Sequence, residues 1–510
     1  MKTDGGNLKN AGTGQKSKNT GQKPKNAGQK SKNTGQKQKS AGRKLKNAGA
    51  GQEKAKRAVN LRELALQALL SIEKDGMYSH LVIGGMLDKY NYLEAQEKAF
   101  FKRLVEGTLE RRIEIDYRLS SVSKTPVAKM KPLIRELLRM SVYQLLFMDG
   151  VPDRAVCDEA VKLAERHSFH SLKGFVNGVL RSVARNKDAD TYPDREADRS
   201  GYLSVRYSMP RWLIEKWDAE QGCERTEAIL KGLLEERPVT VRLRSGMSRA
   251  ETEMIRRELE EQGIRAAQDP YLPYAWHLEK SEGMKNIPAF ADGKLTVQDV
   301  SSMLAVEAAG IRQGDFVIDT CAAPGGKALF ASEKAGESGR VLARDVSEYK
   351  LSLIEEARRR MRADNVALQR WDAAVCDPEM IGRADVVLVD APCSGYGVIG
   401  KKRDIKYRAT PEGGESLCLI QRAILTASWQ YVKPGGVLLY STCTISRAEN
   451  EETADWFLRK FPFHAESLRA YLPERLGGEV GESGCFQFLP GVHGTDGFFI
   501  ERFVRNIYKK

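Results

Sequence analysis

Two cysteines stand where a reaction could use them, in short runs of small and hydroxyl-bearing residues that follow strand-like segments. Cys393 lies in the run Asp390-Ala-Pro-Cys-Ser-Gly395, and Cys443 lies in the run Leu438-Leu-Tyr-Ser-Thr-Cys-Thr-Ile445. Small neighbours leave both sulfur atoms reachable, which favours a reaction that uses a thiolate and a thiol together. A single cysteine in such a place would more often be an inert, buried thiol.

A glycine-rich turn, Cys321-Ala-Ala-Pro-Gly-Gly-Lys327, follows a strand-like run and precedes a segment of helical composition. Glycines there let a ligand approach backbone N–H groups at the positive end of a helix. A phosphate-binding P-loop would need Gly at 321 and Ser or Thr at 328, and the dinucleotide fingerprint would need Gly where Cys321 and Ala323 stand. The turn therefore favours a different adenosine-bearing ligand over a plain strand-to-helix connection.

Aspartates stand at or near the ends of four successive predicted strands: Asp319, Asp345, Asp372 and Asp390. Helical segments separate these strands, as in a doubly wound parallel sheet, whose carboxyl ends form the ligand crevice. One such aspartate is usually a helix cap or turn former, whereas four in register indicate a site. Asp345, after the second strand, is placed to accept hydrogen bonds from ribose hydroxyls.

The length of 510 residues predicts about three domains. No apolar run approaches membrane length and no secretory signal opens the chain, so we expect a cytoplasmic protein without a membrane partner. The eight cysteines include no C-x-x-C pair, which predicts neither a metal site nor a disulfide framework. Inert buried thiols are expected at the five cysteines outside the turn and the two runs. These are Cys157, Cys223, Cys376, Cys418 and Cys485.

Positive charge is concentrated at the N-terminus. Residues 1–57 hold 16 Lys and Arg against Asp4 and Glu53, so the whole formal net charge of +14 lies there. The segment repeats with a period of seven, but every repeat contains glycine and no position is consistently apolar, so no coiled-coil seam can form. We predict a disordered basic repeat tail over residues 1–56. It either attracts nucleic-acid phosphates or is only a solvated extension.

Two further domains are predicted between the tail and the crevice. Residues 57–187 show helical periodicity throughout and form an all-α bundle. Residues 200–290 form a small α+β module, in which an alternating strand, an amphipathic helix and a second strand follow one another. Arg242 and Arg244 project from one side of the first strand, which fits either a surface for a nucleic-acid backbone or a solvated sheet face.

Motifs in the last half of the chain resemble, in order, those of the RNA (cytosine-5) methyltransferases. They are Gln298-Asp-Val-Ser-Ser302, Cys321-Ala-Ala-Pro-Gly-Gly-Lys327, Asp390-Ala-Pro-Cys-Ser-Gly-Tyr-Gly-Val-Ile399, Asp404-Ile-Lys-Tyr-Arg408 and Tyr440-Ser-Thr-Cys443. The bundle, with Phe175-Val-Asn-Gly-Val-Leu-Arg181, resembles the NusB-like RNA-binding domain. Together they resemble the bacterial 16S ribosomal RNA type of that family (RsmB/Sun-like). Ala328 departs from the threonine usual after the lysine, and the basic tail is no part of the family pattern.

The resemblance implies a multidomain fold: a NusB-like bundle, the small α+β module, and an α/β Rossmann-like class I methyltransferase domain over residues 291–510 with a mostly parallel sheet. It implies S-adenosyl-L-methionine as cofactor. The cofactor-binding residues it implies are Cys321, Ala322, Ala323, Pro324, Gly325, Gly326, Lys327, Asp345, Asp372 and Asp390. The implied partner is 16S ribosomal RNA or a small-subunit assembly intermediate, bound by a monomer.

The implied reaction is methylation of cytosine C5, in which Cys443 adds to C6, Asp390 contacts N3, and Cys393 assists removal of the C5 proton. The two cysteines could exchange roles, because DNA cytosine methyltransferases use a Pro-Cys nucleophile similar to Pro392-Cys393. Two other functions stay open. One is a non-catalytic RNA-binding or assembly factor, and the other is a cytosine-5 methyltransferase acting on another RNA such as tRNA.

Overall fold

The computed structural model describes residues 59–189, 192–279, 284, 287–476, 479–480 and 484–507. The predicted disordered tail of residues 1–56 lies outside these ranges. Within the described ranges, no helix combines the length and the apolar character that a membrane crossing needs.

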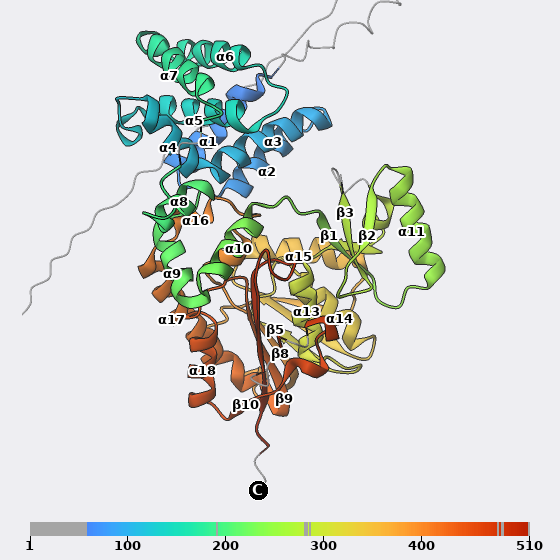
Figure 1. Cartoon of the computed structure of the whole chain (residues 1–510). Helices are drawn as coiled ribbons and strands as arrows, with labels where there is room; N and C mark the ends of the chain where they lie inside the picture. Colours follow the sequence, from blue (N-terminus) through green and yellow to red (C-terminus); the bar gives the residue numbers. More distant parts are fainter. Residues whose placement is uncertain are drawn as a thin grey trace, which may run out of the picture. The chain divides into compact units, whose positions relative to one another are not determined.

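The first part of the described chain is a bundle of seven helices (Figure 1). They are α1 (Leu61–Lys74), α2 (Ser79–Lys89), α3 (Ala95–Glu110), α4 (Arg112–Val122), α5 (Pro132–Phe147), α6 (Asp153–Arg166) and α7 (Lys173–Arg185). Their apolar faces meet in one core, in which Phe101, Leu137 and Leu180 are fully buried. The helical spacing of apolar residues therefore has the cause expected of it, burial of one stripe on each helix.

Three short helices connect the bundle to the rest of the chain. They are α8 (Arg199–Arg206), α9 (Arg211–Gln221) and α10 (Cys223–Leu234). Their core includes the fully buried Trp217 together with Tyr396 and Ile445, which belong to the segments that carry Cys393 and Cys443. Helices α8, α9 and α10 therefore pack against the segments that carry the two cysteines.

The small module is an antiparallel sheet of four strands with helix α11 (Arg249–Glu261) beside β2 and β3 (Figure 1). The strands lie in the order β2 (Arg265–Gln268), β3 (Ala275–Glu279), β1 (Val239–Leu243) and β4 (Leu295–Val297). The first strand, β1, pairs antiparallel with β3, with Val239 opposite Leu278 and Arg242 opposite Ala275. The short helix α12 (Pro288–Ala291) leads into β4.

The prediction for Arg242 on β1 is wrong in both of its forms. The side chain is neither solvated nor free to bind a nucleic acid. It is fully buried, and its guanidinium donates two hydrogen bonds, of 2.7 and 3.0 Å, to the Glu333 carboxylate. It also lies over the Phe330 ring at 4.2 Å. The face of β1 that carries Arg242 packs against a helix of the next domain. Arg244 lies one residue beyond the end of β1, so the two arginines do not share the strand as predicted, and Arg244 is exposed.

The last domain is built on an eight-stranded sheet. Its strands lie in the order β10 (Phe463–Ala465), β12 (Phe498–Arg505), β9 (Val432–Thr442), β8 (Ala384–Asp390), β5 (Phe316–Asp319), β6 (Arg340–Asp345) and β7 (Val366–Arg370), with β11 (Cys485–Phe488) paired to β12. The strands from β9 to β7 are parallel. The pairings of β12 with β10, β11 and β9 are antiparallel, so the sheet is mostly parallel, as predicted.

Helices cover both faces of this sheet. On one face lie α13 (Val300–Ala309), α14 (Gly326–Ala335) and α15 (Glu348–Met361), and on the other lie α17 (Pro411–Ser428) and α18 (Glu451–Lys460). Successive strand residues alternate between the two cores: Val386 and Leu388 face the first, and Val387 and Val389 face the second. This three-layer arrangement is the one that βαβ crossovers produce.

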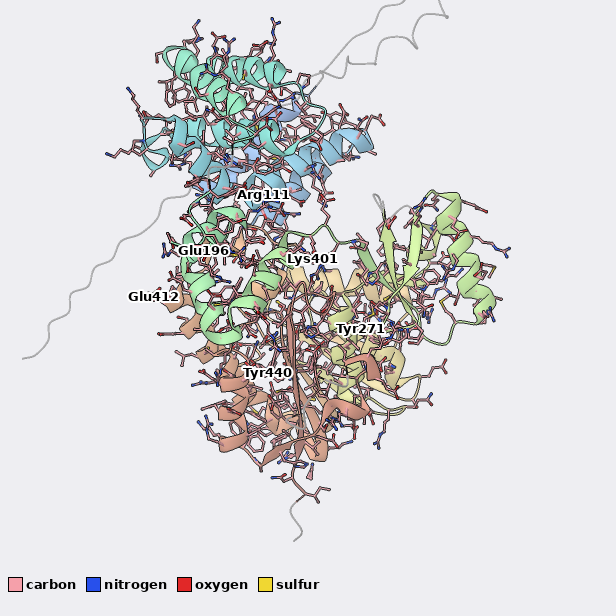
Figure 2. The ribbon with its side chains drawn as sticks, viewed as in Figure 1. Arg111, Glu196, Tyr271, Lys401, Glu412 and Tyr440 are labelled. Carbon is pink, nitrogen blue, oxygen red and sulfur yellow. The ribbon has the colours of Figure 1, made fainter. Side chains whose placement is uncertain are left out.

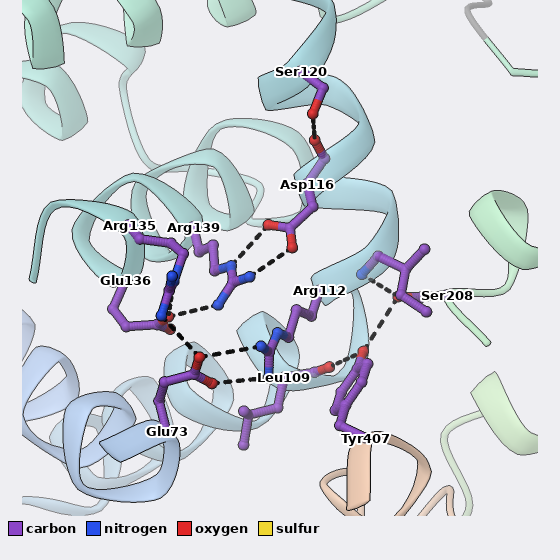
Figure 3. A network of polar contacts seen from close by, with 11 residues as sticks. Glu73, Leu109, Arg112, Asp116, Ser120, Arg135, Glu136, Arg139, Ser208 and Tyr407 are labelled. Atoms are coloured by element: carbon purple, nitrogen blue, oxygen red, sulfur yellow. Dashed lines mark hydrogen bonds and ion pairs between the residues drawn. The ribbon is translucent and has the colours of Figure 1, made fainter. Parts of the chain in front are cut away.

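The Asp404–Arg408 motif joins this domain to the helical bundle. Its short helix α16 (Ile405–Arg408) carries Tyr407, whose hydroxyl donates to the Leu109 carbonyl at 2.7 Å and lies 3.5 Å from Ser208 Oγ (Figure 3). Asp404 accepts a 2.5 Å hydrogen bond from the Ser79 hydroxyl. The motif therefore has a docking role that its residues alone did not reveal.

Candidate active site

The candidate site lies where the parallel sheet reverses its strand order. From the central strand β5 the chain continues to β6 on one side, and β8 lies on the other. Ligand crevices form at such points, outside the carboxyl ends of the strands. Asp319, Asp345 and Asp390 each occupy the last position of a strand at this edge, and Cys443 follows the last residue of β9.

The glycine-rich turn follows β5 and has the backbone that its sequence predicts. The N–H of Ala322 donates to the Arg344 carbonyl at 2.8 Å, which ties the turn to β6. Gly325 has φ of +104°, a conformation that requires glycine, and a Cβ there would lie only 3.1 Å from the Ile354 side chain. Helix α14 begins at the next residue, Gly326, and points its N-terminal N–H groups toward this edge.

Asp345 and Asp372 lie on neighbouring strand ends but in different surroundings. Asp345 is buried, accepts a 3.0 Å hydrogen bond from the N–H of Ser347, and lies 3.7 Å from the Lys350 ammonium. Asp372 is exposed, and its carboxylate accepts from the N–H of Ala374. Asp345 is thus the more firmly oriented acceptor for hydroxyl donors of a ligand.

Asp319 is a residue of this site to which the sequence reasoning assigned no role beyond its place at a strand end. One carboxylate oxygen accepts from the N–H of Cys321 at 3.3 Å, while Oδ2 is buried without a partner in the described part of the chain. Burial and the nearby Asp390 raise the pKa of Asp319 to about 7. An orphaned acceptor beside the glycine turn fits a ligand that brings a hydrogen-bond donor there.

Lys327 and Asp390 form an ion pair inside the crevice. The Lys327 ammonium lies 2.8 Å from Asp390 Oδ2, and the Ser441 hydroxyl donates to Oδ1 at 2.9 Å. The same ammonium lies 3.4 Å from the Ser302 hydroxyl. The carboxylate is therefore fixed by partners from two other elements. Ser302 and Ser441 lie inside recognised motifs, but their sequence gave no sign of these contacts.

The two cysteines meet at the ends of β8 and β9. Cys393 Sγ and Cys443 Sγ lie 3.3 Å apart, although 50 residues separate them along the chain. We assign the Cys393 thiol as donor: its hydrogen bond lowers the pKa of Cys443, and Lys402 and Lys327 act in the same direction. The contact with Cys443, burial and the Glu449 carboxylate raise the pKa of Cys393. Cys443 is thereby favoured as the thiolate and Cys393 as the thiol.

Comparisons of the chain with known proteins place it in a family. The protein of Bacillus subtilis (strain 168) called Probable ribosomal RNA small subunit methyltransferase B is 36% identical over 454 residues, which cover 87% of this chain and 98% of that protein. The chain belongs to the RsmB/F family of 16S rRNA methyltransferases. A Ribosomal RNA small subunit methyltransferase B from Cronobacter sakazakii is 30% identical, covering 88% of this RsmB/F family member and all of the relative.

Each part of this RsmB/F protein matches its own family. Residues 59–185 match the NusB family, residues 209–284 the RsmF/B-like ferredoxin-like domain, and residues 308–504 the 16S rRNA methyltransferase RsmB/F domain. The crystal structure of PH0851 has the same fold, with a TM-score of 0.71 and 24% identity, covering 88% of this chain and 99% of that one. The predicted family and three-part fold are confirmed. The domain limits proposed from the sequence and the roles of single site residues stay predictions.

The protein is therefore an rRNA methyltransferase that uses S-adenosylmethionine, as the family implies. The residues at the crevice are of the types that can bind this cofactor. Gly325 and Gly326 leave room against the backbone, Asp345 offers a buried acceptor suited to ribose hydroxyls, and Asp319 offers an unpaired oxygen. Asp319 lies beside the turn of residues 321–327, and we propose that it faces the cofactor's amino-acid portion together with that turn.

Proposed function

We propose that this RsmB/F methyltransferase methylates C5 of a cytosine in 16S ribosomal RNA through a transient covalent bond between Cys443 and C6 of the base. The observation that carries this proposal is the 3.3 Å contact of two thiols at one sheet edge, in a crevice that also holds Asp390. C5 of cytosine is a poor nucleophile, and addition of a thiolate at C6 moves electron density onto it. The pair of sulfur atoms supplies a nucleophile and a second group for proton transfer.

The first step uses Cys443 and Asp390. The lowered pKa of Cys443 raises its thiolate fraction at neutral pH, so that its sulfur can add to C6. Asp390 contacts N3, and the Lys327 ammonium, 2.8 Å from the Asp390 carboxylate, supplies the positive charge and the proton that the developing negative charge at N3 needs. The bound cofactor supplies the electrophilic methyl group that C5 takes up.

The second step uses Cys393. While Cys443 is a thiolate, its hydrogen bond with Cys393 keeps the pKa of Cys393 high. Bonding of the Cys443 sulfur to C6 removes that charge, so Cys393 can lose its proton to solvent and become a base. Its thiolate then takes the C5 proton, the electron pair of the C5–H bond forms the C5–C6 double bond, and Cys443 leaves as a thiolate.

The base must reach both sulfur atoms in a crevice formed by strand ends. A cytosine stacked in a duplex cannot do so, and the target is therefore expected to be single-stranded or flipped out. The NusB-like bundle and the ferredoxin-like module are expected to hold the surrounding RNA.

The test is transfer of radiolabelled methyl groups to unmodified 16S RNA and to small subunits, with identification of the methylated nucleoside. We expect 5-methylcytosine from the wild type, no transfer and no adduct from Cys443→Ala, and a trapped protein–RNA adduct from Cys393→Ala. Cys223, expected from the sequence to be buried, is exposed on α10, and Cys223→Ala is therefore the matched control that should behave as wild type.

Three outcomes would change the proposal. An adduct that forms only when Cys393 is present would exchange the roles of the two cysteines. Methylation of tRNA in preference to 16S RNA would change the substrate. No transfer to any of these RNAs, with RNA binding retained, would favour a non-catalytic assembly factor.

A further inference from the structure

We propose that Glu449 and Asn450 are positioning residues of the two-thiol site, which tie the segment carrying Cys393 to the segment carrying Cys443 and so keep the sulfur atoms in contact. The two residues stand side by side just before α18 and are both fully buried. Neither belongs to the motifs that carried the family resemblance. The proposal rests on the proposed function, since it concerns the same two sulfur atoms.

Glu449 holds the Cys393 segment on both sides of the cysteine. Its carboxylate accepts hydrogen bonds from the N–H of Ser394 at 2.9 Å and from the Ser394 hydroxyl at 2.5 Å. It also accepts at 3.0 Å from the Gln421 amide, which donates at 3.1 Å to the Pro392 carbonyl. Cys393 lies between these two anchored neighbours and has little freedom to move.

Asn450 holds the Cys443 segment in the same way. Its Oδ1 accepts from the Thr442 hydroxyl at 2.6 Å, and its Nδ2 donates to the Thr444 carbonyl at 3.1 Å. A second bond from Nδ2, of 2.7 Å, reaches Gln487 on β11. Every polar atom of this side chain is used, and an amide is the only group of this size that offers both donors and an acceptor here.

Two further contacts join the anchored segments. The hydroxyls of Ser394 and Thr444 lie 2.7 Å apart, so the residues that follow the two cysteines are bonded to each other. The Tyr440 hydroxyl on β9 donates to the Glu449 carbonyl at 2.6 Å, which fixes the backbone of Glu449 and Asn450. Tyr440, labelled in Figure 2, is itself fully buried. The sulfur contact is thus the product of a closed hydrogen-bond network.

The network also separates the chemical roles of the two sulfurs. The Glu449 carboxylate acts on Cys393 and raises its pKa, whereas the ammonium groups of Lys402 and Lys327 act on Cys443. Asp390 raises the pKa of both thiols, so the difference between them comes from their own hydrogen bond, from Glu449 at Cys393 and from the two ammonium groups at Cys443. The hydrogen-bond geometry and the surrounding charges therefore both favour Cys443 as the thiolate and Cys393 as the thiol.

The experiment uses Glu449→Gln, which keeps the size but removes the charge, and Asn450→Asp, which keeps the size but removes both donors. We expect kcat for RNA methylation to fall about 10- to 100-fold in each variant, because small misplacements of reacting groups cost this much. KM for RNA and the Kd for S-adenosylmethionine should change by less than about threefold. Alkylation of each cysteine, followed by mass spectrometry across pH, should show a lower pKa of Cys393 in Glu449→Gln.

Glu452→Gln is the matched control, since Glu452 stands on the same helix start but is exposed, with Arg447 at 3.9 Å. It should match the wild type in every readout. The proposal is overturned if both test variants keep kcat within about twofold, or if kcat, cofactor affinity and melting temperature fall together, as in general unfolding. If the wild type does not methylate cytosine, the proposed function fails. If the variants keep the alkylation profile of the wild type, the positioning role is refuted.

Discussion

At the level of single residues, two aspartates that look equivalent in the sequence differ in the structure. Asp345 is buried and oriented by the N–H of Ser347, whereas Asp372 is exposed. We predict that Asp345→Ala raises the Kd for S-adenosylmethionine about 10-fold or more, because a hydrogen bond to a charged acceptor contributes about 1.5–3 kcal/mol. Asp372→Ala should change it by less than about threefold. Isothermal titration calorimetry measures both, and equal losses would show that burial does not set the ranking.

Glu501 on β12 predicts a pH dependence of stability. Burial, with Asp455 and Glu451 nearby, raises the pKa of this carboxyl from 4.5 to about 8. Between these pH values the unfolded chain has lost a proton that the folded chain keeps, so the free energy of unfolding falls as pH rises through this window. Glu501→Gln should remove that part of the slope and raise stability at pH 8 by about 2 kcal/mol.

Urea unfolding of wild type and Glu501→Gln at intervals from pH 5 to pH 9 measures this difference. His464→Gln, which alters an exposed residue on β10, is a control for changes elsewhere on the sheet. Parallel curves for wild type and Glu501→Gln would mean that the carboxyl is ionised in the folded protein at neutral pH.

At the level of elements, a buried ion pair joins the ferredoxin-like module to the methyltransferase domain. Arg242 of β1 and Glu333 of α14 are bonded at 2.7 Å, with Arg242 fully buried. We predict that Arg242→Ala lowers the free energy of unfolding by about 3–5 kcal/mol, because it leaves a buried carboxylate without its cation. Arg244→Ala, at an exposed position one residue beyond the same strand, should cost no more than about 0.5 kcal/mol.

A double-mutant cycle makes this prediction sharper. Replacing both Arg242 and Glu333 with leucine should cost less than the sum of the two single changes, since no unpaired charge remains. Chemical denaturation of the four proteins gives the coupling free energy. Strict additivity would mean that the two side chains do not interact in solution.

At the level of the whole molecule, the bundle and the catalytic domain are joined through residues 403–408. The Arg403 guanidinium lies 3.0 Å from Glu106 and 2.9 Å from Glu110 on α3, and Asp404 accepts from Ser79. Figure 3 shows the neighbouring network, in which Arg112 and Arg135 share Glu73. Two domains bonded in this way should unfold together.

We predict one calorimetric unfolding transition for the wild type and two for the double variant Arg403→Ala, Asp404→Ala, because the cooperativity of unfolding depends on the contact between the domains. Glu412→Ala, an exposed change on α17, should keep the single transition. A single transition in the double variant, at the wild-type temperature, would show that these contacts contribute little to the coupling.

The local sequence determined the elements and the edge of the sheet at which the site forms. Apolar runs ending in aspartate marked β5, β6 and β8, helical spacing marked the bundle, and the glycines of the turn required their backbone geometry. These signals are local, because side chains repeat every two residues in a strand and about every 3.6 residues in a helix. The same signals brought Asp345 and Asp390 to one edge, since parallel strands end together.

Tertiary structure alone decided which of these residues touch. The 3.3 Å contact of Cys393 with Cys443, the burial of Arg242, and the bonds of Glu449 and Asn450 all join segments far apart in the chain. Strand order and helix packing set such contacts, and no periodicity along the chain encodes them. The sequence motifs therefore identified both cysteines as candidates, whereas only the fold showed the polar network that holds them together.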